Sequence, residues 1–422
     1  MRISIMKILL AIVQSSLILV SVSSESIYED NASEYEGAQL FKIERSPFVT
    51  NMLKEKNLDL WRSNSTFHDV LVEKDKVEEV KLLLYSQEII YTVMDTNLAT
   101  TIRNNNVPLN ETTMRRLKNI MIPTFRHYQT VEAIHAYLDH LASKYPEIAT
   151  VGIMGYSSQK KPLKYIKISS GKENAKVFVI DAGIHAREWV APAAATFIIK
   201  QLVVNRKKLP KALLSLDFYV LPTFNPDGYE YSYLKKRLWR KNRSKNDCGF
   251  GADINRNFDV GFGGKGTNSN PCSDIYPGKS PHSEPETQAF MKFINDLKNN
   301  LSAYVTFHSY GQYILIPFGY DLNSLAPDYD EMERVGTIAA SAIKKLDGKT
   351  YQVGNTAMLL YPAAGGSDDW VKTATKAKYV YTIELRDEGE HGFILPEEYI
   401  LPTVREAFTA IKVIATAAYR NE

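Results

Sequence analysis

Hydrophobic and polar positions alternate in short runs along residues 38–100, and longer helical patterns separate these runs. Four runs have the period of half-buried strands, and two segments have the spacing of amphipathic helices. In chain order they predict strands at Ala38–Ile43, Leu58–Arg62, Phe67–Val72 and Ile89–Val93, with helices at Pro47–Glu55 and Lys74–Ser86. This β-α-β-β-α-β order predicts a small open-faced α+β sandwich of the ferredoxin-like kind.

From about residue 130 the strand runs become continuously apolar and alternate with helical patterns. The strand runs lie near Tyr165–Ile168, Val177–Asp181, Phe218–Leu221, Ala303–Phe307 and Val380–Ile383. The helical patterns lie near Val131–Lys144, Ala193–Val204, Pro285–Asn299, Tyr329–Leu346, Asp369–Thr375 and Thr403–Tyr419. This alternation predicts one large α/β domain with a mostly parallel, twisted sheet and helices on both faces. A chain of 422 residues also exceeds one typical core, so we expect two domains.

The first 24 residues have the pattern of a secretory signal peptide. Arg2 and Lys7 precede the apolar run Ile8–Val20, and small residues follow it. The run is too short for a convincing membrane span and no other run approaches that length, so we expect a secreted, extracellular protein that is not held in a membrane. In an oxidising compartment the two cysteines of the chain, Cys248 and Cys272, should form a disulfide.

The N-terminal segment and the rest of the chain differ in net charge. Residues 25–116 contain 11 Lys/Arg and 16 Asp/Glu, a net charge of −5, whereas the whole chain carries +3. Opposite charges favour an N-terminal segment that is held against the rest of the chain partly by electrostatic attraction. The pair Arg115-Arg116 predicts a protease cleavage site at the end of this segment, with Lys118 and Arg126 as competing sites. No basic stripe with interleaved aromatic residues occurs, so nucleic-acid binding is not expected.

Metal-binding chemistry is suggested where the run Val177–Asp181 ends. Gly183 stops the run, His185 follows, and Glu188 comes three positions later. This pair can bind one Zn²⁺, although a surface His and Glu on a helical turn is the alternative reading. A catalytic zinc needs a third protein ligand, and His308 is the best candidate because it also ends an apolar strand run. Four other histidines are expected to be solvated, namely His68, His127, His135 and His140. His282 and His391 are expected to lie in polar loops.

Glu384 follows the strand run Val380–Ile383 and stands among apolar neighbours. A carboxylate that is buried without a partner is costly. Beside a metal-bound water, however, such a group can act as a general base with a shifted pKa. The alternative is an internal ion pair with an arginine such as Arg386.

Seven motifs occur in a fixed order between residues 185 and 387. They are His185-Ala-Arg-Glu188, Asn225-Pro-Asp-Gly-Tyr, Trp239-Arg-Lys-Asn-Arg243, Asp253-Ile-Asn255-Arg256-Asn, His308-Ser-Tyr, Tyr361-Pro-Ala-Ala-Gly-Gly-Ser-Asp368-Asp-Trp and Ile383-Glu384-Leu-Arg-Asp. Together they resemble the zinc metallocarboxypeptidases of the pancreatic A/B type, which are secreted as zymogens. The resemblance covers essentially the whole chain after the signal peptide.

The resemblance implies three regions, with a signal peptide at 1–24, an activation pro-segment at 25–116 and a catalytic domain at 117–422. The catalytic domain is expected to contain a mixed, mostly parallel eight-stranded sheet. The pro-segment is expected to inhibit the enzyme until a trypsin-like protease removes it. The expected substrates are the C-termini of peptides and proteins, and the expected molecule is a monomer.

The same resemblance assigns the chemistry of one Zn²⁺ held by the His185, Glu188 and His308 side chains. Zinc lowers the pKa of its bound water and polarises the scissile carbonyl. Glu384 is expected to take the water proton and to deliver it to the leaving amine. Arg243 is expected to stabilise the oxyanion, whereas Arg240 fits a functional role and ordinary surface charge equally well.

Five further side chains are assigned by resemblance. Asp253 is expected to accept the other ring N–H of the first histidine ligand and to fix its tautomer. Asn255 and Arg256 are expected to bind the terminal carboxylate of the substrate. Tyr361 matches a mobile tyrosine that closes over the substrate, and Arg187 matches an arginine that lines the substrate path.

Asp368 occupies the position that decides specificity in this family. An aliphatic residue there resembles the A type, which takes apolar and aromatic C-terminal residues, whereas aspartate resembles the B type, which takes Lys or Arg. A buried carboxylate is satisfied by a cationic side chain and is left unpaired by an apolar one. The alternative is that Asp368 only caps the helix near Trp370. Thr356 stands where the B type usually has glycine, so the preference between Lys and Arg is left open.

Two other functions remain possible at this stage. One is a secreted binding protein that has kept the fold but lost catalysis, and the other is an A-type carboxypeptidase. Five sequons permit N-glycosylation, and the one beside Arg243 is expected to be unused. They lie at Asn31, Asn64, Asn110, Asn242 and Asn300.

Overall fold

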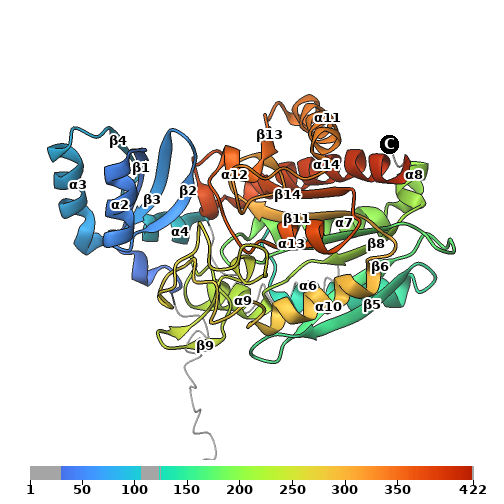
Figure 1. Cartoon of the computed structure of the whole chain (residues 1–422). Helices are drawn as coiled ribbons and strands as arrows, with labels where there is room; N and C mark the ends of the chain where they lie inside the picture. Colours follow the sequence, from blue (N-terminus) through green and yellow to red (C-terminus); the bar gives the residue numbers. More distant parts are fainter. Residues whose placement is uncertain (1–29, 106–122, 124, 421–422) are drawn as a thin grey trace, which may run out of the picture.

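The computed structural model describes residues 30–105, 123 and 125–420, which form two parts that lie side by side (Figure 1). The N-terminal part, residues 30–105, is a four-stranded antiparallel sheet in the order β2-β3-β1-β4. Its elements are η1 (Ser33–Tyr35), β1 (Gln39–Glu44), α2 (Pro47–Glu55), β2 (Asp59–Ser63), β3 (Phe67–Val72), η2 (Lys74–Lys76), α3 (Val77–Ser86), β4 (Tyr91–Asp95) and α4 (Leu98–Asn105). The predicted β-α-β-β-α-β sandwich is therefore confirmed.

Local sequence explains where the first helix of this part begins. The Ser46 hydroxyl accepts a hydrogen bond from the Val49 backbone N–H, and Pro47 stands at the first helical position. A serine cap satisfies one free N–H of the first turn, and proline has no N–H to satisfy. Met52 and Leu53 are buried on one face, which fixes the helix against the sheet.

The C-terminal part, residues 125–420, contains an eight-stranded mixed sheet in the order β13-β12-β14-β11-β7-β8-β6-β5. The strands are β5 (Ala149–Tyr156), β6 (Pro162–Ile168), β7 (Val177–Ala182), β8 (Asp217–Leu221), β11 (Leu301–Ser309), β12 (Tyr313–Ile316), β13 (Gln352–Asn355) and β14 (Tyr379–Leu385). The central strands β8, β7, β11 and β14 run parallel to one another. A separate short hairpin pairs β9 (Lys245–Asn246) with β10 (Gly249–Phe250).

Helices cover both faces of this sheet, as predicted (Figure 1). The helices are α6 (Val131–Lys144), α7 (Val190–Val203), α8 (Lys211–Leu214), α9 (Pro226–Leu234), α10 (Pro285–Leu297), α11 (Tyr329–Asp347), α12 (Thr356–Leu359), α13 (Ser367–Ala374) and α14 (Ile400–Arg420). Strand β7 divides its side chains between two cores. Phe178 and Ile180 belong to the core that contains α7, α11 and α14, whereas Val177 and Val179 belong to the core that contains α10 and α13.

Some elements and environments differ from the predictions. Strands β5, β12 and β13 and helix α9 were not predicted, and the two four-residue strands are too short to show a clear period. The expectation that His68 and His135 are solvated is wrong, because both are buried. His68 is 3% exposed within β3, and the Nε2 atom of His135 lies 3.0 Å from the Thr223 hydroxyl.

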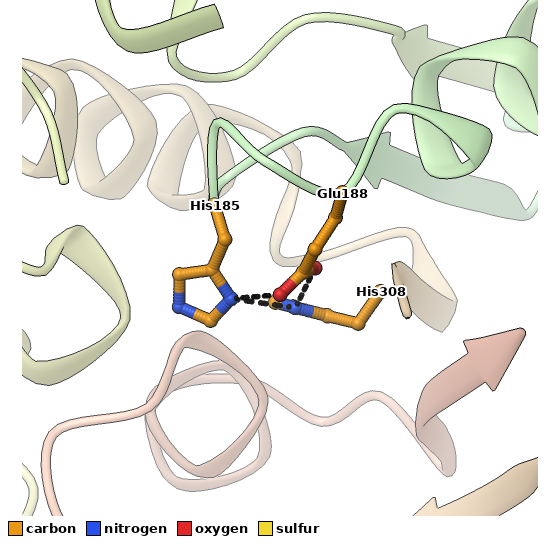
Figure 2. Close-up of side chains that lie close together, drawn as sticks. All are labelled: His185, Glu188 and His308. Atoms are coloured by element: carbon orange, nitrogen blue, oxygen red, sulfur yellow. Dashed lines mark hydrogen bonds and ion pairs between the residues drawn. The ribbon is translucent and has the colours of Figure 1, made fainter. Parts of the chain in front are cut away.

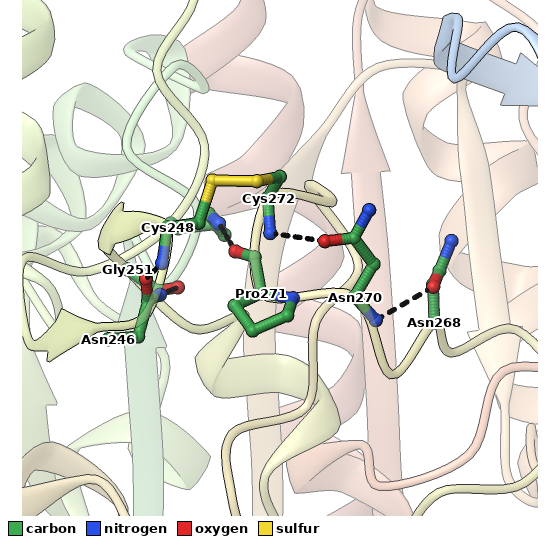
Figure 3. The surroundings of a disulfide bond; sticks show 8 residues. Asn246, Cys248, Gly251, Asn268, Asn270, Pro271 and Cys272 are labelled. Carbon is green, nitrogen blue, oxygen red and sulfur yellow. Dashed lines mark hydrogen bonds between the residues drawn. A yellow bond between two sulfur atoms is a disulfide. The ribbon is translucent and has the colours of Figure 1, made fainter.

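The two cysteines form the predicted disulfide, which joins the turn between β9 and β10 to a later loop (Figure 3). The Cα atoms of Cys248 and Cys272 are 5.2 Å apart, within the usual range for a disulfide. Asn246 and Asn270 accept hydrogen bonds from the backbone N–H groups of the two cysteines. The loop is therefore held both covalently and by side-chain hydrogen bonds.

The N-terminal part packs against the loops at one end of the C-terminal sheet. The Trp61 ring contacts the rings of Tyr310 and Phe393, with centroids 6.4 and 5.0 Å away. The buried Asn31 side chain donates to the backbone carbonyl of Tyr233 at 3.0 Å. No helix among the described residues is long and apolar enough to cross a bilayer. The predicted signal peptide and the sites Arg115, Arg116 and Lys118 lie outside the described residues.

Candidate metal centre and active site

The chain brings His185, Glu188 and His308 together at the carboxyl ends of two adjacent parallel strands. Strand β7 ends at Ala182, and Gly183 then turns the chain with a φ of +74°. Glycine adopts this left-handed conformation without strain, and a Cβ there would also lie 3.0 Å from the Pro192 side chain. His308 is the penultimate residue of β11, which pairs with β7.

The three side chains point toward one another (Figure 2). The Nδ1 atom of His185 lies 2.7 Å from Glu188 Oε1, and the Nδ1 atom of His308 lies 3.0 Å from Glu188 Oε2. The two Nδ1 atoms are 3.1 Å apart. Two ligands that bind zinc at about 2.0–2.1 Å with tetrahedral geometry are about 3.3 Å apart. Two nitrogens and a carboxylate are also a donor set that zinc prefers, so these residues fit the metal.

Asp253 contacts the ring nitrogen of His185 that does not face Glu188. Its Oδ1 atom lies 3.1 Å from the Nε2 atom of His185, and its Oδ2 atom accepts two hydrogen bonds from the Arg240 guanidinium at 3.0 and 2.8 Å. Burial alone would raise the pKa of Asp253, but Arg240 and His185 outweigh it and hold that pKa well below its usual range. A fully charged carboxylate favours the tautomer in which the His185 Nδ1 atom is free to bind a metal.

Glu384 lies directly opposite His308 in the register of β11 and β14, and its side chain lines the same pocket as the three candidate ligands. Burial raises the pKa of the Glu384 carboxyl, and the neighbouring Glu188 raises it further, whereas His308 lowers it. The alternative ion pair with Arg386 is wrong. The Arg386 guanidinium instead donates to the carboxylate of Glu406.

The pocket extends from the candidate ligands toward the start of α13. Asn255, Arg256, Tyr361 and Asp368 all line it, so the structure brings these predicted residues together. The Arg256 guanidinium is fixed by hydrogen bonds to the backbone carbonyls of Gly266 and Asn255 at 3.0 and 2.9 Å. Such bonds hold a cation in place while leaving other N–H groups for a ligand.

Asp368 lines this pocket and is 6% exposed. Its Oδ2 atom accepts a hydrogen bond from the Thr382 hydroxyl at 3.0 Å. The adjacent Asp369 instead accepts hydrogen bonds from the backbone N–H groups of Gly319 and Tyr320. The capping alternative for Asp368 is wrong, because α13 begins at Ser367, its N-cap is Gly366, and no side chain caps it.

Thr356 and Gly319 are neighbours in the lining of the same pocket. A Cβ on Gly319 would lie 3.1 Å from the Thr356 methyl group. The Thr356 hydroxyl donates to the backbone carbonyl of Ile316 at 3.2 Å. Thr356 therefore forms part of the pocket wall beside Gly319.

The structure places a different arginine at the metal centre from the one predicted. Arg240 lines the pocket and its Nη1 atom is 4.0 Å from Glu188 Oε1. Arg243 does not line it. Its guanidinium instead stacks on the rings of Tyr231 and Phe250, at 3.7 and 4.3 Å from their centroids. The prediction erred because both arginines belong to one motif, and only the course of the chain decides which one faces the ligands.

Arg187 is 1% exposed, and its contacts reach across to the N-terminal part. Its Nη1 atom lies 2.8 Å from Asp59 Oδ2 and 3.5 Å from Asp274 Oδ2. Trp61, Arg62 and Ser63 of the N-terminal part line the metal pocket itself. The N-terminal part therefore covers the route by which a peptide would reach the candidate ligands.

The candidate sequons fall in different environments. Asn242 is fully buried, and its amide donates to the carboxylates of Glu284 and Glu286, so it is inaccessible to a glycan. Asn31 is also buried, whereas Asn300 is exposed. Asn110 lies outside the described residues.

Comparisons with known proteins agree with this geometry. Carboxypeptidase B of Astacus astacus is 42% identical over 68% of this chain and 96% of its own length. Carboxypeptidase A4 of Mus musculus is 35% identical over 90% of this chain and 93% of its own length. The crystal structure of thrombin activatable fibrinolysis inhibitor superposes with a TM-score of 0.81 and 31% identity, over 92% of this chain and 100% of that one.

Family sequence patterns divide the chain in the same way. The pattern described as zinc carboxypeptidase matches residues 134–410, and the pattern described as carboxypeptidase activation peptide matches residues 48–105. The first match covers most of the C-terminal part and the second most of the N-terminal part. The chain therefore belongs to the zinc carboxypeptidase family and carries that family's activation peptide in front of a zinc metallocarboxypeptidase domain.

Proposed function

We propose that this protein is a secreted zymogen of a carboxypeptidase that removes C-terminal Lys or Arg. The observation that carries this proposal is the buried carboxylate of Asp368 in the wall of the metal pocket. The relatives include both A-type and B-type enzymes, so family membership alone does not select a substrate.

The charge and hydrogen bonding of Asp368 support a cationic substrate side chain. Asp369 has both oxygens committed to backbone N–H groups, whereas the described partner of Asp368 is a single hydroxyl. A buried carboxylate with free acceptor capacity favours a ligand that brings a positive charge and several N–H donors. An apolar side chain would leave the same carboxylate desolvated and unpaired, which disfavours A-type substrates.

The catalytic roles follow from positions around the candidate ligands His185, Glu188 and His308. When bound, zinc lowers the pKa of a water molecule and polarises the scissile carbonyl. The Glu384 carboxylate takes a proton from the attacking water and passes it to the nitrogen of the leaving amine. The Arg240 guanidinium, in place of Arg243, donates to the carbonyl oxygen as negative charge develops there.

Recognition of the chain end is assigned to the residues next to the metal pocket. Arg256 and Asn255 bind the terminal carboxylate of the substrate through charged and neutral N–H donors. Tyr361 lies beside them and closes over the substrate, and Arg187 lines the path of the preceding residues. Asp253 keeps the first histidine ligand in its metal-binding tautomer.

The N-terminal part acts as an inhibitor in this proposal, because it covers the pocket with Trp61, Arg62 and Ser63. We assign residues 25–116 to the pro-segment and residues 117–422 to the enzyme. A trypsin-like protease is proposed to cut near Arg115-Arg116, Lys118 or Arg126. The signal peptide at 1–24, extracellular location and a monomeric state belong to the same proposal.

Hydrolysis of hippuryl-Arg and hippuryl-Phe tests the proposed specificity. The purified full-length protein is treated with trypsin, and its zinc content is measured beside both rates. We expect one zinc per chain and a kcat/KM for hippuryl-Arg that exceeds that for hippuryl-Phe by orders of magnitude. The reverse preference would establish an A-type enzyme, and bound zinc without turnover of either substrate would indicate a binding protein.

A further inference from the structure

A second hollow of about 950 Å³ lies beside the metal pocket, between the N-terminal and C-terminal parts. Four residues line both cavities, namely Trp61, Ser63, Arg240 and Tyr361. The two cavities are therefore adjacent. A peptide whose terminal side chain contacts Asp368 in the metal pocket must lead its preceding residues out through a neighbouring space. This hollow adjoins the metal pocket and can provide that space.

The wall that the C-terminal part contributes to this hollow is strongly cationic. Among the described residues of that wall there are six basic side chains and one acidic side chain, Asp274. The basic side chains are Arg187, Lys236, Arg240, Lys241, Arg243 and Lys265. Arg240 is paired with Asp253, and Lys265 lies 3.7 Å from Asp321. The other four cations share only Asp274 on this wall, so the wall keeps a positive potential that favours anionic groups.

Two of these cations are held in fixed positions by neutral groups. The Arg243 guanidinium is stacked on the Tyr231 and Phe250 rings. Its Nε atom is buried and has no hydrogen-bond partner among the described residues. The Lys241 ammonium donates to the backbone carbonyl of Pro271 at 2.7 Å. Neither arrangement neutralises the charge, so both side chains remain available to an anion.

The N-terminal part already places acidic side chains on this wall. Asp59 Oδ2 lies 2.8 Å from Arg187 Nη1, and Glu34 Oε2 lies 2.6 Å from Lys236 Nζ. Removal of the N-terminal part would leave Lys236 without this carboxylate and Arg187 with the more distant Asp274. These contacts thus show that the cations of the wall bind carboxylate groups.

We propose that, in the activated enzyme, this cationic wall binds acidic side chains of the substrate a few residues before its C-terminal Lys or Arg. The enzyme would then prefer peptides in which Asp or Glu precedes the basic end, and it would disfavour a run of basic residues. This proposal rests on the proposed carboxypeptidase activity and adds a second determinant of substrate choice. Asp368 selects a positively charged terminal residue, and the cationic wall selects negatively charged residues before it.

The test uses trypsin-activated full-length protein and peptides that end in Arg. One residue X, placed second, third or fourth from the end, is Glu, Gln or Lys in an otherwise identical sequence. We expect kcat/KM to fall in the order Glu, Gln, Lys at one or more positions, with about tenfold between Glu and Lys at low salt. The ratio should shrink as salt rises, because half-exposed charges are screened.

The double variant Lys236→Gln/Arg243→Gln should bring the Glu-to-Lys ratio close to one. Lys292→Gln, an exposed position on α10 outside the hollow, is the matched control and should leave the ratio unchanged. Equal rates for Glu and Lys peptides at every position would overturn the inference while the carboxypeptidase proposal stood. A ratio that persists in the double variant would also overturn it, whereas no turnover of any peptide would refute the proposed function itself.

Discussion

The placement of Arg240 rather than Arg243 beside the candidate ligands leads to a sharp prediction about catalysis. We expect Arg240→Gln to lower kcat on hippuryl-Arg by about 100- to 1000-fold, because one donor to a developing oxyanion contributes about 3–4 kcal/mol. KM should change much less, since the interaction is made mainly in the transition state. Arg243→Gln should change kcat by less than about threefold, because its guanidinium lies among aromatic rings outside the pocket.

The assay must separate a catalytic effect from loss of the metal, because Arg240 also holds Asp253, which contacts His185. Zinc content is therefore measured for both variants, and kcat and KM are determined on trypsin-activated protein. Arg240→Lys retains a charge but not the two hydrogen bonds to Asp253, and it should recover only part of the rate. A normal kcat in zinc-loaded Arg240→Gln, with a large loss in Arg243→Gln, would show that the structural reading of the two arginines is incorrect.

Two further predictions follow from the buried side chains of Asp368 and Glu286, and a third from the exposed disulfide. Asp368→Ala should lower kcat/KM on hippuryl-Arg by about a hundred- to several-thousand-fold, the effect of about 3–5 kcal/mol for breaking a buried ion pair, without loss of zinc; unchanged kinetics would contradict the specificity assignment. Burial raises the pKa of Glu286 to about 7, so the folded state holds this proton more tightly than the unfolded state, and stability should fall as pH rises from about 4.5 to 7. Glu286→Gln should flatten that part of the pH dependence of Tm, and an unaltered slope would count against it. Cys248→Ser/Cys272→Ser should lose roughly 3 kcal/mol of stability in urea unfolding, because the disulfide closes a loop over a separation of 24 residues; an unchanged midpoint would show that the loop is already fixed without the bond.

The order of elements could be predicted from the sequence because each has its own local signal. The apolar run at Val177–Asp181 became β7 with one added residue, and the helical pattern at Val131–Lys144 became α6 with the same bounds. The turn at Gly183 also placed His185 and Glu188 together, because they are close in sequence. The short strands β12 and β13 could not be predicted, since four residues carry too little periodicity.

Predictions from the local sequence pattern were also wrong where burial of a side chain depends on distant segments. His68 lies in the N-terminal region and His135 on an amphipathic helix, and both were expected to be solvated, yet both are buried by neighbouring elements. Arg240 and Arg243 lie three residues apart in one motif and differ in what they face. Arg240 is turned toward Asp253, and its backbone carbonyl accepts a hydrogen bond from Ala186, which ties this loop to the segment that carries the ligands.

The sequence by itself determined the family, the two-part organisation, the disulfide partners and the residue types of a zinc site, because these depend on motifs and on their order along the chain. Only the tertiary structure decided that His308 meets the pair His185 and Glu188, that Arg240 lies beside them, and that the N-terminal part covers the pocket with Trp61. The physical reason is that strand register and loop packing bring residues together across more than a hundred positions, and no local pattern records these contacts.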